Sequence, residues 1–220
     1  KLLPPEVRER SDAYWKKRTL APSAFILYLG IDGKIPNLKH HNLLFCQNWK
    51  RTFDQTFEHP SWPDDPSLYV CAPSVTDPSV APEGMENLFI LVPIAANLPD
   101  TEKIRQSFRE KILRTLEEEM GIPNLKTRIR VEKLFCVNDF TERYNSLGGS
   151  ALGLAHTLWQ TAIFRPNNIS KKVKGLYYVG ANTNPGIGMP MVFASAELVY
   201  KRLYNIKSAG PLTKLENDPL

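Results

Sequence analysis

The stretch Gly175-Leu-Tyr-Tyr-Val-Gly-Ala-Asn-Thr-Asn-Pro-Gly-Ile-Gly-Met-Pro190, followed by the run Met191 to Leu203, decides how the rest of the chain is interpreted. Leu176 to Val179 is short, apolar and bounded by glycines, which predicts a strand. A glycine-rich turn follows, and then a helix that starts near Pro190, since proline is tolerated in a first helical turn. Glycines let the backbone approach a ligand, and a helix N-terminus favours negative charge. The stretch therefore predicts a site for a polar or anionic ligand, unless the turn only reverses the chain.

A second distinctive stretch lies just upstream, Gly149-Ser-Ala-Leu-Gly-Leu-Ala-His-Thr-Leu-Trp-Gln-Thr-Ala-Ile-Phe-Arg-Pro166. Together the two stretches resemble the C-terminal signature of bacterial-type phytoene desaturases, the FAD-dependent carotenoid desaturase/isomerase family. The resemblance continues through Ala72 to Gly84 and Phe25 to Gly30, in the family's order, and covers most of the chain. Asn182 and Asn184 depart from the family pattern, which has a glycine and a histidine there. These two departures leave the particular substrate open.

The resemblance implies the C-terminal portion of a flavoprotein that desaturates a long isoprenoid, phytoene or a related carotenoid precursor, with FAD as its cofactor. It implies a partial substrate-binding domain over residues 1–147, a return to the FAD-binding domain over 148–205, and a tail over 206–220. The fingerprint Gly-x-Gly-x-x-Gly, which opens such flavoproteins, is absent from the sequence. We therefore expect an N-terminal FAD-binding half, in the same or a separate chain, to be a partner. We expect this chain alone to be inactive.

The resemblance also assigns site residues. The residues expected to contact the flavin are Gly180, Ala181, Asn182, Gly186, Gly188, Met189 and Pro190. The residues expected near flavin or substrate are Gln160, Arg165, Trp159 and Phe164. Arginine keeps its charge in a protein, so Arg165 pairs either with a structural carboxylate or with the flavin and its phosphates. His156 is more simply a packing residue, and no catalytic residue is assigned.

Aromatic residues are spread along the chain, and several would suit a long apolar cavity for a polyene. The candidates are Phe25, Tyr28, Tyr69, Phe89, Trp159 and Phe164. The same residues would serve equally as ordinary core. An alternative function is a non-catalytic lipid-binding or partner-binding module of the same ancestry, which would keep the sheet and lack the flavin.

The order of elements predicts an α+β fold: a mixed, mostly antiparallel sheet with helices on one face, plus the closing strand-turn-helix of an FAD-binding Rossmann-like domain. Strands are expected over residues 23–31, 43–46, 67–72, 87–95 and 127–135, and helices over 5–17, 49–57, 100–120 and 138–144. The helix over 100–120 has its apolar residues on one face, with Thr101 or Asp100 as cap and Gly121 at its end. In the last strand, alternation places Ile129 and Val131 inward and Glu132 outward.

Composition bounds the remaining possibilities. The 220 residues are 42% hydrophobic and 23% charged, with a net charge of +5, as in an ordinary soluble protein. No signal peptide, membrane span or nucleic-acid pattern is visible. The three widely spaced cysteines suggest neither a disulfide framework nor a zinc site, so no metal is predicted. Because a polyene is insoluble in water, we expect a cytoplasmic protein held peripherally at a membrane, through an apolar patch beside Lys16 and Lys17 or Lys171, Lys172 and Lys174.

Overall fold

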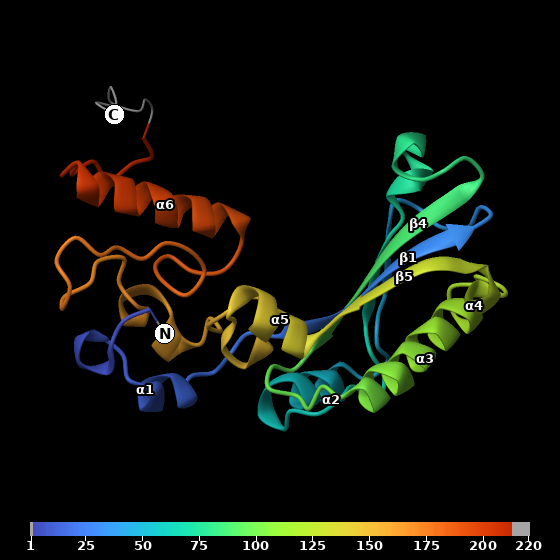
Figure 1. Ribbon diagram of the computed structural model, residues 1–220, viewed down its shortest axis with the longest axis horizontal. Coiled ribbons are helices and arrows are strands. Elements are labelled where there is room, and N and C mark those ends of the chain that lie inside the picture. Colours follow the sequence, from blue (N-terminus) through green and yellow to red (C-terminus); the bar gives the residue numbers. More distant parts are fainter. Residues whose placement is uncertain (1, 213–220) are drawn as a thin grey trace. The chain divides into compact units, whose positions relative to one another are not determined.

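The computed structural model describes residues 2–212, which form two compact units (Figure 1). One unit is Pro22–Ala151, and the other combines Lys1–Ala21 with Leu152–Leu220. The predicted division placed the first 21 residues with the sheet, whereas the structure groups them with the C-terminal segment. Backbone hydrogen bonds explain the difference. Ala21 N donates to the Gly153 carbonyl at 2.8 Å, and Ala155 N donates to the Thr19 carbonyl at 3.0 Å.

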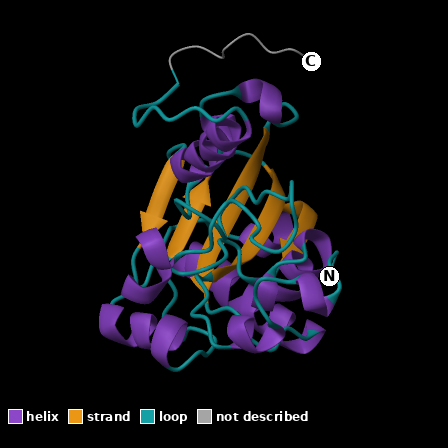
Figure 2. Ribbon diagram, turned by 90° about the vertical axis from the view of Figure 1, so that its left-hand side faces the viewer, coloured by secondary structure: helices purple, strands orange, loops and turns teal. Residues whose placement is uncertain are grey.

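The unit Pro22–Ala151 is built on a five-stranded sheet (Figure 2). The strand order is β2-β3-β4-β1-β5, and every pairing is antiparallel. The strands are β1 (Ser23–Asp32), β2 (His41–Leu44), β3 (Leu68–Cys71), β4 (Met85–Ile94) and β5 (Ile129–Phe135). The helices are α2 (Trp49–Phe53), α3 (Glu102–Glu118), α4 (Leu125–Arg128) and α5 (Val137–Tyr144). The predicted α+β class is thus confirmed, and β2 begins two residues earlier than expected.

Helices α2, α3 and α4 lie on one side of the sheet (Figure 1), and the core forms between α3 and the strands. Thr101 caps α3 by accepting a hydrogen bond from Ile104 N, and is one of the two caps, Asp100 or Thr101, predicted from the sequence. The buried face of α3 is Phe108, Ile112, Leu113 and Leu116. These side chains pack on the inward residues of β1 and β4, as the periodicity of the sequence predicts.

Alternation fails in β5. The β1–β5 register shifts between Gly30 and Ile31, so that Ile129 lies opposite Ile31 while Val131 lies opposite Gly30. The irregularity turns Val131 to the outer face, where it is 66% exposed. Glu132 instead points to the α3 side and pairs with Arg109. The predicted inward position of Val131 and outward position of Glu132 are therefore wrong, because a bulge changes the alternation that the prediction assumed.

The second unit contains two α-helices among its described residues, α1 (Asp12–Lys16) and α6 (Met189–Leu203). The helix expected over 5–17 is shorter, because Ser11 adopts an extended conformation and caps α1 through Tyr14 N. The expected start of a helix near Pro190 is confirmed. Leu176 to Val179 does not form a strand: its only ladder pairing in the described chain is the bridge between Tyr177 and Ile169. A strand needs a neighbour along its whole length, and this segment has one at a single position.

Between residues 2 and 212, no helix is both long enough and apolar enough to cross a membrane. The predicted tail over 206–220 falls mostly outside the described residues.

Candidate functional site: the glycine turn before α6

The predicted turn is present and runs directly into α6. Gly180, Gly186 and Gly188 have φ values of 112°, 140° and 108°, a region that favours glycine, and the Asn184–Pro185 peptide is cis. Gly188 is the N-cap of α6, and no side chain of the described residues caps this helix end. Met189 and Pro190 occupy its first turn and are exposed. The positive end of the α6 dipole is therefore open to an approaching group.

The three glycines of the turn differ in what surrounds them. A Cβ on Gly186 would overlap the imidazole of His156. The same imidazole accepts a hydrogen bond from Ile187 N through Nε2 at 3.0 Å, so the exposed His156 side chain is used within the turn. A Cβ on Gly180 or Gly188 would meet no described atom within 4 Å. Gly180 and Gly188 thus leave room for a ligand to approach the backbone, whereas the space beside Gly186 is filled by the chain itself.

A buried polar pair holds the turn against α6. Asn168 and Ser195 are both fully buried. The Ser195 hydroxyl accepts from Gly180 N and from Asn168 Nδ2, each at 3.1 Å. Asn168 Nδ2 also lies within hydrogen-bonding distance of the carbonyls of Tyr178 and Asn184. Neither residue of this pair was predicted from the sequence. The feature that could have indicated the pair is Ser195, a polar residue on an otherwise apolar stretch of helix.

Arg165 is a structural centre of the unit. The side chain is 2% exposed, and its guanidinium donates to the carbonyls of Thr183 at 3.2 Å, Gln160 at 2.9 Å and Leu154 at 3.0 Å, and also to that of Ala181. Burial lowers the pKa of this guanidinium. Among the described residues its hydrogen-bond partners are backbone carbonyls rather than the structural carboxylate that the sequence left open. Arg165 therefore shapes the turn from behind.

Gln160 is likewise buried and used within the chain. Its Oε1 accepts from Thr19 N at 2.9 Å, and its Nε2 donates to the carbonyls of Thr19 and Ala155 at 2.8 and 3.1 Å. The side-chain amide thus binds the N-terminal segment as a neighbouring strand would. Asn182 also has an internal role, since its Oδ1 accepts from Leu154 N at 3.0 Å.

Trp159 and Phe164 behave differently from Gln160. They are 66% and 47% exposed, and their rings meet edge to face with centroids 5.0 Å apart. Large apolar side chains that are exposed next to one another often mark a binding surface. The structure therefore separates the four predicted flavin-proximal or substrate-proximal residues into two buried polar braces and two exposed aromatic residues.

A cavity of about 520 Å³ opens beside the segment that leads into the turn. It is lined by Tyr178, Val179, Asn182 and Thr183 on one side, and by residues of the N-terminal segment on the other. The charged residues of the lining are Arg8, Glu9 and Arg10. Arg8 already contacts Asp12, and much of the remaining lining, such as Leu3, Trp15 and Leu176, is apolar, so the cavity is mainly apolar with a few charged groups.

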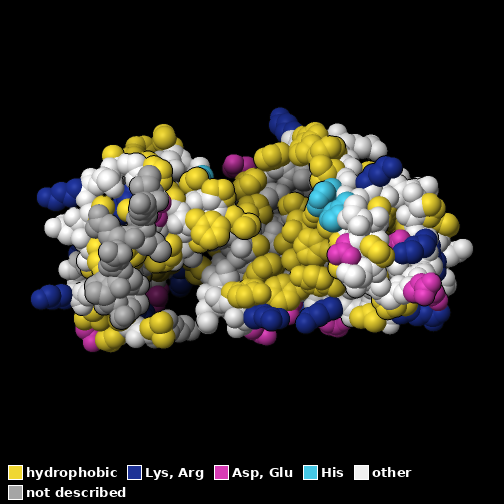
Figure 3. All heavy atoms as spheres, turned by 90° about the horizontal axis from the view of Figure 1, so that it is seen from above, with side chains coloured by type: hydrophobic (Ala, Val, Ile, Leu, Met, Phe, Trp, Pro, Cys, Tyr) yellow, Lys and Arg dark blue, Asp and Glu magenta, His cyan; other side chains and the backbone are white. Residues whose placement is uncertain are grey.

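The unit Pro22–Ala151 offers a different surface, the face of the sheet opposite α3. Tyr28, Tyr69 and Phe89 share this face, with ring centroids 5.3 Å apart for Tyr28–Phe89 and 6.1 Å for Tyr69–Phe89. Figure 3 looks onto it: hydrophobic side chains gather in a broad yellow patch bordered by histidines. Phe25 is not part of this surface, because it is fully buried in an aromatic cluster with Trp62 and Phe108. Of the aromatic residues expected to line a cavity, three thus share one open face.

Comparison with known proteins identifies the class to which this architecture is related. Homologues over most of the chain are carotenoid and phytoene desaturases, as the resemblance of the two signature stretches implied. The carotenoid 3,4-desaturase of Haloarcula japonica is 53% identical over 196 residues, which are 89% of this chain and 39% of that protein. The zeta-carotene-forming phytoene desaturase of Myxococcus xanthus is 40% identical over 86% of this chain and 37% of its own length.

A third relative, the 4,4'-diapophytoene desaturase of Staphylococcus aureus strain Newman, is 36% identical over 80% of this chain and 36% of its own length. The chain thus spans less than two fifths of these relatives. No family model matches the sequence. A solved structure of an oxidoreductase from Methanosarcina mazei covers 86% of this chain and 36% of its own at 18% identity, with a TM-score of 0.49, too low to support an argument.

Proposed function

We propose that this chain forms part of an FAD-dependent enzyme that desaturates a long isoprenoid, a carotenoid or one of its precursors. The observation that carries the proposal is the 53% identity with a carotenoid 3,4-desaturase over 89% of the chain. When bound, FAD would supply the acceptor for the hydride removed from the substrate. The residues of this chain would bind and orient the two molecules. The complementary N-terminal FAD-binding half remains the proposed partner.

The turn before α6 fits a flavin. Gly180 and Gly188 have open space beside them, and the N-terminus of α6 has no side-chain cap in the described chain. Backbone N–H groups and a helix dipole of this kind suit a pyrophosphate or the polar edge of a ring system. Asn168 and Ser195 would keep Gly180 in place while the cofactor binds. The turn would therefore hold the flavin, and the buried side chains behind the turn would fix its shape.

The open face of the sheet fits the substrate. Tyr28, Tyr69 and Phe89 present aromatic surface along neighbouring strands, and a polyene is a long apolar molecule. Burying each 100 Å² of apolar surface contributes roughly 2.5 kcal/mol. A sheet face extended over several strands therefore matches the shape and the chemistry of an isoprenoid chain.

A chimera tests the proposal: this chain replaces the homologous segment of the Haloarcula japonica enzyme. We expect the purified chimera to contain flavin, measured by its visible absorbance per protein. We also expect it to convert carotenoid when expressed in cells that accumulate the precursor. A chimera that folds with flavin but gives no desaturated product would contradict the desaturase assignment. A folded chimera with neither flavin nor product would favour the non-catalytic lipid-binding or partner-binding module.

Two glycines provide a matched pair for the flavin contact. Gly188 and Gly175 both have positive φ, and neither would meet an atom within 4 Å if it carried a Cβ. Valine at either position therefore strains the backbone without overlapping a described neighbour, but only Gly188 lies at the start of α6. We expect Gly188→Val in the chimera to weaken flavin binding by about tenfold, which is about 1.4 kcal/mol, and Gly175→Val to leave it unchanged. Equal losses in the two variants would show that Gly188 does not contact the flavin.

We further propose that the protein draws its substrate from a membrane surface through an exposed aromatic stripe. Phe45, Trp49, Phe53 and Phe57 follow one another at intervals of four residues, with ring centroids 5.5, 6.2 and 5.9 Å apart. Each is between 39 and 59% exposed. Trp49 and Phe53 lie in α2, whereas Phe45 precedes this helix and Phe57 follows it. A row of exposed aromatic side chains suits the interface of a bilayer. The contact is therefore assigned to this stripe rather than to Lys172, whose ammonium donates to the Glu6 carbonyl.

Liposome sedimentation of the chimera tests this contact. Full burial of an aromatic side chain contributes roughly 1.5–3 kcal/mol, so Trp49→Ser with Phe53→Ser should reduce binding at least about tenfold. Tyr144→Ser, an exposed aromatic of the same unit, is the control and should bind as before. Equal binding of the double variant and the parent would exclude the stripe. Failure of the chimera to sediment at any salt concentration would exclude membrane association itself.

A further inference from the structure

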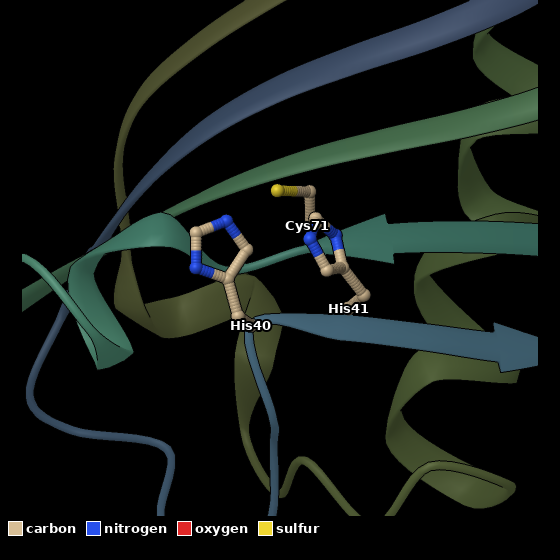
Figure 4. Close-up of side chains that lie close together, drawn as sticks. All are labelled: His40, His41 and Cys71. Atoms are coloured by element: carbon tan, nitrogen blue, oxygen red, sulfur yellow. The ribbon is translucent and has the colours of Figure 1, made fainter.

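Two histidines and a cysteine converge at the edge of the sheet (Figure 4). His41 opens β2 and is paired with Cys71 at the end of β3. His40 immediately precedes β2, and its ring centroid lies 4.3 Å from that of His41. One potential ligand atom from each of the three residues lies within 4.8 Å of the other two. Strand pairing thus brings Cys71 to two adjacent histidines that lie about 30 residues earlier in the sequence.

The remaining ring nitrogens already have partners. His40 Nδ1 lies 2.6 Å from Thr76 Oγ1, and His41 Nδ1 lies 2.8 Å from the Tyr69 hydroxyl. Hydrogen bonds of this kind orient an imidazole and leave its Nε2 free to bind a cation. Metal-bound histidines almost always carry such a second hydrogen bond. Both rings are therefore oriented as ligands would be.

The donor set determines which metal suits the site. A thiolate and two imidazoles favour a borderline-soft ion such as Zn²⁺ over Mg²⁺ or Ca²⁺, which prefer oxygen. Zinc bonds of about 2.0 Å to nitrogen and 2.3 Å to sulfur place tetrahedral ligand atoms roughly 3.3–3.7 Å apart. Atoms within 4.8 Å reach this spacing by moving about 1 Å. The partly exposed side chains of His40 and Cys71 and the exposed side chain of His41 permit that movement.

We propose that His40, His41 and Cys71 bind one zinc ion, with the fourth position taken by water or another small ligand. The ion would clamp β2, a strand of only four residues, to β3. It would also stand beside Tyr69, on the open face of the sheet. The cysteine spacing in the sequence predicts no metal site, because two of the three ligands are histidines and the third is distant along the chain. This inference is independent of the proposed flavin and carotenoid chemistry.

Cobalt titration of the complete chain, purified without a polyhistidine tag, tests the site. Co²⁺ bound by a thiolate gives a charge-transfer band in the near ultraviolet, and Zn²⁺ should abolish it by displacement. We expect one equivalent to bind, more tightly as the pH rises, because the thiol must lose its proton. We expect Cys71→Ser to remove the band, and His41→Gln to weaken binding at least about tenfold. Tyr69→Phe, which removes the hydrogen bond to His41, should weaken it by roughly tenfold.

His59→Gln is the matched control, because His59 is an exposed histidine of the same unit that contacts Asp54 instead. It should bind cobalt as the parent does. Circular dichroism verifies that each variant is folded, and the chimera replaces the isolated chain if the latter precipitates. Absence of saturable binding would overturn the proposal, as would a charge-transfer band that persists in Cys71→Ser or disappears in His59→Gln.

Discussion

Replacing Arg165 with methionine tests whether this side chain stabilises the fold or binds the cofactor. The guanidinium donates to four backbone carbonyls, and no carboxylate shares its pocket in the described structure. A hydrogen bond to a charged group contributes roughly 1.5–3 kcal/mol, so four have a gross value of about 6–12 kcal/mol. Desolvation of the buried ion offsets several kcal/mol of this. We therefore expect Arg165→Met to destabilise the protein by about 3–5 kcal/mol.

Urea denaturation of the chimera measures this loss, and flavin absorbance of the folded fraction measures cofactor binding. Lys174→Met, an exposed cation of the same unit, is the control and should change stability by less than about 0.5 kcal/mol. Arg165→Lys should lie between the two, because an ammonium has three donors and lacks the planar fork. A stable Arg165→Met variant that lost its flavin would refute the structural role and restore the cofactor contact.

Three further perturbations follow from individual contacts. Gly186→Ala should destabilise the protein by overlap with His156, and adding His156→Ala should recover part of the loss in a double-mutant cycle followed by urea denaturation. Burial raises the pKa of the Cys136 thiol to about 12. The buried neutral thiol therefore stabilises the protein fully at neutral pH, and this stabilisation declines as the pH rises from 9 to 12. Cys136→Ala should flatten the dependence of unfolding free energy on pH in this range. Arg130 lowers the pKa of Asp32, so this pair stabilises the protein above about pH 4 and less as the pH falls, and Asp32→Asn should remove that dependence.

Much of the fold follows from patterns that are local in the sequence. The apolar residues of α3 recur on one helix face between a capping threonine and a glycine, so the helix and its buried side are both predictable. β1 and β4 are rich in branched and aromatic residues and are bounded by turn residues. These elements need little information from the rest of the chain to be recognised.

The orientation of β5 is a contrasting case. Its residues alternate in type, but the register shift beside Gly30 reverses which of them face α3. A bulge depends on how two strands meet, and neither strand alone encodes it. The same holds for Leu176 to Val179, whose composition suits a strand but which pairs at a single bridge. Strand pairing depends on residues far apart in the sequence, so it is the feature of a fold that a single sequence predicts least well.

The backbone conformation of the candidate site was more predictable from the sequence than the roles of its side chains. Glycines and a proline in a fixed order predict a turn and a helix start, because each restricts or frees the backbone locally. The roles of Gln160 and Arg165 depend on carbonyls that folding brings to them from Thr19 and Thr183. The same long-range assembly hid Asn168, whose amide joins three parts of the unit.

The two faces of the sheet show why aromatic composition alone does not define a substrate cavity. Phe25 and Phe89 lie in adjacent strands of similar composition, yet Phe25 is fully buried against α3 and Phe89 belongs to the open face. Truncating Phe25 would cost roughly 3–5 kcal/mol of stability, so its size is set by the core. The size of Phe89 is under no such constraint from α3. The core therefore leaves the identity of the residues on the open face unconstrained, and under the proposed function these residues are the ones whose variation would change the substrate.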